Sequence, residues 1–129
     1  MKNRITLLAI LLISSLGFAQ SGAKIDFAAR ENTIDYGKIS KGNDSGIRTF
    51  EFTNTGDAPL IITSVQSTSS CTILSKIKDS ILPGKIGKIE VKYNMAVGPI
   101  RKTITVESNA VNYEGGRVAL KLKGEVVEN

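Results

Sequence analysis

Cys71 is the only cysteine of this sequence, and its thiol could serve as a metal ligand or a strong nucleophile. A catalytic thiol or hydroxyl works beside a base, usually histidine, and a structural zinc site needs several Cys or His ligands. The sequence has no histidine and no second cysteine, which removes both kinds of site. Paired carboxylates remain, but a domain this small seldom encloses the concave pocket that acid–base chemistry needs. We therefore expect no enzyme activity, no cofactor and no metal.

Two other classes of ligand have weak support. The segment Gly42–Gly46 (GNDSG) gathers oxygen atoms, but Asp44 is its only acid, and a calcium loop needs spaced acids and a terminal Glu. A plain turn is the favoured interpretation. Sugar binding commonly uses exposed aromatic rings, and the sequence has no tryptophan. Only Tyr36, Tyr93 and Tyr113 could stack on a sugar, and the sequence pattern turns Tyr93 inward.

A basic region runs from residue 76 to residue 102. It carries seven bases against Asp79 and Glu90, a local net charge of +5. The bases are Lys76, Lys78, Lys85, Lys88, Lys92, Arg101 and Lys102. One interpretation is an electrostatic surface for an anionic ligand. The other, which we favour, is that these lysines keep a β-sheet protein soluble and prevent its sheet edges from pairing with other chains. Nucleic acid is not expected as a partner, because no recognition motif is present.

The first nineteen residues predict export. "MKNRITLLAILLISSLGFAQ" has a basic head at Lys2 and Arg4, then an apolar stretch, then small residues before Gln20. This is the three-part pattern of a cleaved secretory signal. Cleavage after Ala19 would lower the formal net charge from +5 to +3. The apolar run is interrupted by two serines and is short for a membrane span, so we expect no anchor. The chain is therefore predicted to divide into a signal peptide, 1–19, and one domain, 20–129.

Alternating apolar and polar residues predict β-strands in that domain. In "RTFEFTN", for example, Phe50 and Phe52 share one face, as successive strand residues point to opposite sides. Three further segments bury alternate residues in the same way: 88–93, 102–108 and 117–124. Two opening strands are predicted at 24–29 and 33–39. "LIITSV" (60–65) is apolar on both faces, which predicts a more central strand.

Turn-forming residues separate these strands. Pro83 and Gly84 occupy the central positions of a predicted type II turn, where Pro fixes φ and Gly accepts a positive φ. Seven or eight short strands at this spacing, with no helices between them, favour an antiparallel β-sandwich of the immunoglobulin-like kind.

The segments "RTFEFTNTGDAPLIITSVQS", "ILPGKIGKIEVKYN" and "PIRKTITVESNA" together resemble a bacterial family of exported proteins. Its domain has no assigned function and an immunoglobulin-like fold related to Hydin-type and major-sperm-protein domains. The resemblance spans roughly residues 25 to 126. It implies a fold and a compartment more than an activity, since family members are not known as enzymes. Where the family pattern often has Thr after Tyr-Asn, this chain has Met95.

The family usually carries a Ser-Cys-Gly-Cys-Thr loop after the "ITSV" strand. Here the loop reads Thr-Ser-Ser-Cys-Thr, residues 68–72. Ser69 stands in the place of the first cysteine, Ser70 in that of the glycine, and Cys71 in that of the second cysteine. The resemblance therefore implies that Cys71 remains from a cysteine pair whose chemistry a single sulfur would not sustain.

Two interpretations of Cys71 stay open. It could be a half-buried small residue at a strand edge. It could instead be an accessible thiol that bonds to another chain, as odd cysteines in exported proteins can.

Residues and resemblance together predict a non-enzymatic, exported, immunoglobulin-like module for protein interaction or envelope structure. Its expected partner is another envelope or exported protein, bound by a sheet edge or loop, and its expected location is the periplasm or the medium. The alternatives are capture or redox sensing through Cys71, and binding of an anionic ligand at the basic region 76–102.

Overall fold

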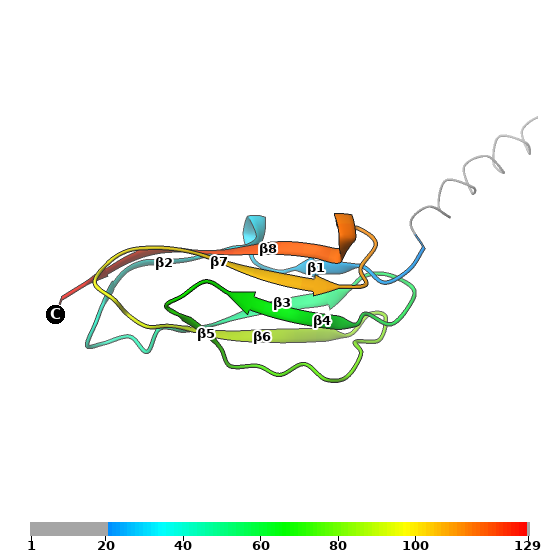
Figure 1. Cartoon of the computed structure of the whole chain (residues 1–129), viewed down its shortest axis with the longest axis horizontal. Helices are drawn as coiled ribbons and strands as arrows, with labels where there is room; N and C mark the ends of the chain where they lie inside the picture. Colours follow the sequence, from blue (N-terminus) through cyan, green and yellow to red (C-terminus); the bar gives the residue numbers. More distant parts are fainter. Residues whose placement is uncertain (1–20, 129) are drawn as a thin grey trace, which may run out of the picture.

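The protein is a two-layered β-sandwich (Figure 1). The computed structural model describes residues 21–128, so the predicted signal peptide lies outside the described residues. One sheet has the strand order β1-β3-β6-β5 and the other β2-β8-β7-β4. The strands are β1 (Ile25–Phe27), β2 (Thr33–Ser40), β3 (Ile47–Asn54), β4 (Ile62–Ser67), β5 (Cys71–Ile73), β6 (Ile86–Tyr93), β7 (Gly98–Ser108) and β8 (Arg117–Val127). Two 3₁₀ turns, η1 (Arg30–Asn32) and η2 (Glu114–Gly116), precede β2 and β8.

The predicted alternation builds the core. Phe50 and Phe52 are fully buried on β3, and Ile89 and Val91 are fully buried on the neighbouring β6. The other sheet supplies Ile104, Val106, Val118, Leu120 and Leu122 from β7 and β8. The immunoglobulin-like sandwich is therefore confirmed, with eight strands. Within the described residues, no helix is long and apolar enough to cross a membrane.

One strand pair is not antiparallel. β2 runs parallel to β8, with Ile34 opposite Leu122 and Ile39 opposite Val126. The chain leaves the first sheet after β1, passes through η1 and enters the second sheet as β2. This change of sheet brings β2 alongside β8 in the same direction. The alternation of apolar and polar residues alone does not predict this parallel pairing.

The segment 60–65 is an edge strand, so its predicted central position is wrong. β4 has β7 on one side and no strand on the other. Leu60 lies just before β4 and is fully buried through its bridge to Ile81, while Ile61 is 49 % exposed. The apolar residues in this run are therefore apolar for different reasons: Leu60 is buried at a bridge, Ile61 is exposed, and Val65 lies on the inner face of an edge strand. Together they give the same sequence pattern as a strand that is covered on both faces.

The turn at Pro83 and Gly84 forms as predicted. The backbone N–H of Lys85 donates to the carbonyl of Leu82 at 2.9 Å, and Gly84 has a φ of +83°. A positive φ at the third position of the turn is the feature that requires glycine. The turn leads directly into β6.

Asn54 is the one buried polar residue among residues 21–128. Its side-chain amide donates to the carbonyls of Ala58 and Ile81, both at 2.8 Å. Its side-chain oxygen accepts from the backbone N–H of Gly56 at 2.9 Å and of Lys24 at 3.3 Å. One amide group therefore holds together three separate chain segments at this end of the sandwich.

Candidate binding surfaces

Cys71 is the first residue of β5 and lies opposite Tyr93 of β6. It is half-buried and packs against the hydrophobic core. Burial raises the pKa of its thiol, and the opposing influence of Lys102 is smaller. Because the thiolate is the reactive form, this setting keeps the sulfur protonated and poorly nucleophilic near neutral pH.

Ser70 has a φ of +79°, the left-handed region that favours glycine. Its carbonyl accepts from the backbone N–H of Asn94 at 2.9 Å, which ties the loop to the end of β6. Ser69 precedes it and is exposed. The loop has the backbone shape that a glycine would adopt without strain, at the position where the family pattern has glycine. No sequence signal other than that resemblance indicated the strain.

Replacing Ser70 by glycine should therefore stabilise the protein. Relief of the left-handed strain is expected to exceed the extra chain entropy of glycine, a net gain of up to about 1 kcal/mol. Urea unfolding followed by circular dichroism would measure it. The matched control is Ser69→Gly, which should be neutral or slightly destabilising. Equal effects of the two substitutions would contradict the assignment of strain to Ser70.

The basic region 76–102 does not form one surface. Lys88 and Lys92 lie on the outer face of β6 in the first sheet. Arg101 lies on the exposed face of β7 in the second sheet, and Lys102 alternates with it and is half-buried. The charge excess seen in sequence is therefore divided between the two layers.

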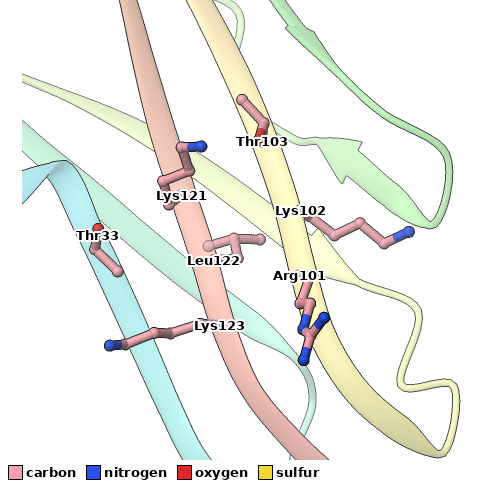
Figure 2. Close-up of a pocket in the computed structure, with 7 residues that line it drawn as sticks. All are labelled: Thr33, Arg101, Lys102, Thr103, Lys121, Leu122 and Lys123. Carbon is pink, nitrogen blue, oxygen red and sulfur yellow. The ribbon is translucent and has the colours of Figure 1, made fainter.

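A shallow depression on the second sheet gathers some of these bases with others from β8 (Figure 2). Its lining residues are Thr33, Arg101, Lys102, Thr103, Lys121, Leu122 and Lys123. Arg101 lies directly opposite Lys123 in the strand register. However, Figure 2 shows that the cationic groups diverge: Lys123 extends over β2 and Lys102 extends away from β8. No small anion could be held by all of them at once.

A groove follows the free edge of β4, between the two sheets. It is lined by β4 from Ile62 to Val65, by Ile73 of β5, and by Ser75, Lys76 and Ile77 beyond it. Ile62, Val65, Ile73 and Ile77 are partly buried hydrophobic residues that pack against the core. The groove therefore presents these apolar side chains together with polar ones from Thr63, Ser64, Ser75 and Lys76.

The turn before β3 is closed by its own side chains. Asp44 forms an ion pair with Arg48 at 3.0 Å and accepts from the backbone N–H of Gly46 at 2.8 Å. Arg48 lies 4.2 Å from the centre of the Tyr36 ring, and the Tyr36 hydroxyl donates to the carbonyl of Gly46. The arginine lowers the pKa of Asp44, and burial raises the pKa of Tyr36 to about 12. Asp44 is thus already paired within a plain turn.

The three tyrosines offer no platform for a sugar. Tyr36 and Tyr93 are 6 % and 3 % exposed, and only Tyr113 is half-buried.

Among the described residues, no group of three Cys, Asp or Glu side chains could hold a metal ion. Met95 also has a positive φ, +64°, and its buried side chain lies beside Gly46.

The two-sheet arrangement is an immunoglobulin-like fold, similar to that of a PapD-like domain and of a major-sperm-protein family member. More particularly, residues 27–126 match the family described as "Protein of unknown function (DUF1573)", and the chain belongs to that family. No curated protein matches the sequence.

Three solved structures share the fold. A protein of unknown function from Porphyromonas gingivalis W83 has 18 % identity and a TM-score of 0.66, over 83 % of this chain and 48 % of that one. The secreted serine protease VesC from Vibrio cholerae has 16 % identity and a TM-score of 0.60, over 80 % of this chain and 23 % of that one. PapD-like domain 7 of human CEP192 has 14 % identity and a TM-score of 0.61, over 82 % of this chain and 87 % of that one. This chain thus spans less than half of the first two proteins, and the likeness concerns the fold alone.

Proposed function

We propose that the protein is an exported, non-catalytic interaction module that binds another envelope protein through the free edge of β4. The observation that carries the proposal is the absence of charge along this edge. Residues 58–75, which include all of β4, contain no Asp, Glu, Lys or Arg. Exposed strand edges are normally protected by charges, prolines or bulges, because their unpaired backbone groups can pair with another chain.

The other sheet edges are protected or short. β1 and β5 have three residues each. β2 is interrupted by a register shift between Asp35 and Lys38, and both of these charged residues are exposed. β4 has an irregularity of its own, between Ile62 and Ser64, but then pairs regularly with β7 through Ser67. Ile81 already pairs with Leu60 just before β4, so an added strand would lie beside Ile62–Ser67, where main-chain hydrogen bonds would hold it.

The proposal is tested by placing a photoreactive phenylalanine analogue at Gln66, which is exposed on β4, in cells that produce the protein. Ultraviolet light should yield a crosslinked species that contains one partner. The same analogue at Ala119, which is exposed on β8, is the matched control and should yield none. A crosslink of equal yield from both positions, or from neither, would refute binding at the β4 edge.

A thiol-dependent role of Cys71 is the main alternative, and it predicts a reactive sulfur. On our proposal, iodoacetamide should modify the native protein more slowly than the urea-unfolded protein at pH 7.5. The native rate should rise as the pH approaches the raised pKa of Cys71. Mass spectrometry of timed samples measures both rates. Equal rates in the native and unfolded protein, with loss of the crosslinked complex in Cys71→Ser, would favour the thiol alternative.

An anionic ligand at the basic region is the second alternative. The divided charges and diverging side chains of Figure 2 give it less support than the β4 edge. It would show as binding that weakens steeply with added salt, because charges at the surface are screened.

A further inference from the structure

We infer that the groove beside β4 accepts an extended segment of a partner protein with alternating apolar residues and at least one carboxylate. This inference rests on the proposed function and names the chemistry of the partner. It depends on the lining of the groove and on the charge at its rim.

The inner face of β4 determines what an added strand would contact. Val65 lies opposite Val106 and Ser67 opposite Ile104, and both β7 residues are fully buried. Val65 therefore points between the sheets, and Gln66 points outward. A strand added beside β4 would continue this sheet, so every second side chain would enter the seam and the others would face solvent.

The groove offers apolar side chains, among polar ones, to the side chains that would enter it. Across it from β4 lie Ile73 of β5 and Ile77, both partly buried. Beyond β5 the chain continues without strand structure, and Ser75, Lys76 and Ile77 of this segment line the groove. The N–H of Leu74 donates to the carbonyl of Glu90, which holds this segment against β6. Apolar side chains of a partner would cover Ile73 and Ile77 and be removed from water themselves.

Charge at the rim selects an acidic partner. Lys76 lines the groove and is the one charged residue that does so. The two ion pairs found within residues 21–128 are Arg48–Asp44 and Arg117–Glu107, so Lys76 takes part in neither. A carboxylate on the incoming segment would pair with it. A second copy of this chain fits less well, because its own β4 edge carries no carboxylate to offer.

The test is a selection from random twelve-residue peptides displayed on phage, using the purified protein without the signal segment as bait. The enriched peptides should alternate apolar and polar residues and contain Asp or Glu. Binding of the best synthetic peptide, followed by fluorescence anisotropy, should weaken about two- to fivefold in Lys76→Glu, the range expected for an exposed ion pair. It should be lost in Val65→Lys, which places a charge in the seam, and unchanged in Ala119→Lys.

Ile77→Asp is a second variant on the opposite wall of the groove, and it should also lose binding. Circular dichroism before each measurement identifies any variant that has not folded. Amide hydrogen exchange with bound peptide should show new protection in β4. Enriched peptides without alternation, or equal binding by Val65→Lys and the unaltered protein, would overturn the inference. The proposed function would still stand if Gln66 crosslinks to a partner in cells, so the two failures are distinguishable.

Discussion

Replacement of Asn54 by alanine should lower the free energy of unfolding by about 2–4 kcal/mol, since each buried polar group left unsatisfied costs about 1–3 kcal/mol. The side chain makes four hydrogen bonds and is fully buried. The substitution would leave the carbonyls of Ala58 and Ile81 and the N–H of Gly56 without this partner. Chemical denaturation with urea measures the change directly.

Asn109 provides the matched control for this prediction. It makes the same kind of clamp: its side-chain oxygen accepts from the N–H of Ile61 at 2.7 Å, and its amide donates to the carbonyl of Pro59 at 3.1 Å. Asn109 is exposed, so water can replace the lost partners. Asn109→Ala should cost at most about 1 kcal/mol, the net value of an ordinary hydrogen bond. Equal losses in the two variants would show that burial is not what makes Asn54 important.

The second large effect is expected at Gly87. This residue lies opposite Phe52 in the register of β3 and β6, and the Phe52 ring lies over it. A Cβ atom at Gly87 would clash with the end of that ring. Phe52 is fully buried and packs against Phe27 at 5.4 Å between ring centres, so the ring cannot move aside freely. Gly87→Ala should therefore cost about 1–3 kcal/mol, the usual range for overpacking a core.

A double-mutant cycle isolates this contact. Phe52→Leu alone should be destabilising because it leaves a cavity under β6. Combined with Gly87→Ala, it should cost less than the sum of the two single changes, because the smaller side chain leaves room for the new methyl group. Thermal and urea unfolding of the four proteins provide the four free energies. If the free-energy changes of the two single substitutions simply add, the new methyl group is accommodated by residues other than Phe52.

Most of the fold was predictable from the sequence, because it depends on local patterns. Alternation at residues 50–52, 89–93 and 118–122 identified the inner faces, and Gly84 identified a turn. The order of the strands depends on pairings between distant segments, which no local pattern encodes. For this reason the position of β4 at a sheet edge and the parallel pairing of β2 with β8 required the structure.

The candidate site was less predictable. Cys71 and Ser70 were noticed because of their residue types and the family resemblance, yet burial and backbone conformation decide their properties. The basic region is continuous in sequence but is divided by the fold between two layers. One feature of the sequence does indicate the groove beside β4: residues 58 to 75 are eighteen consecutive residues without a charge. Their meaning depended on knowing that β4 is an edge strand.

The pairing of β2 with β8 also determines the order in which the protein can complete its folding. β2 starts at Thr33, whereas β8 starts at Arg117 and ends at Val127. Among the strands of residues 21–128, β8 alone links β2 to β7 and β4. The second layer therefore cannot be completed until almost the whole chain is available, because β2 has no partner without β8. Long-range pairing of this kind is slow to form. Completion of the second layer therefore depends on the last strand of the chain to be synthesised.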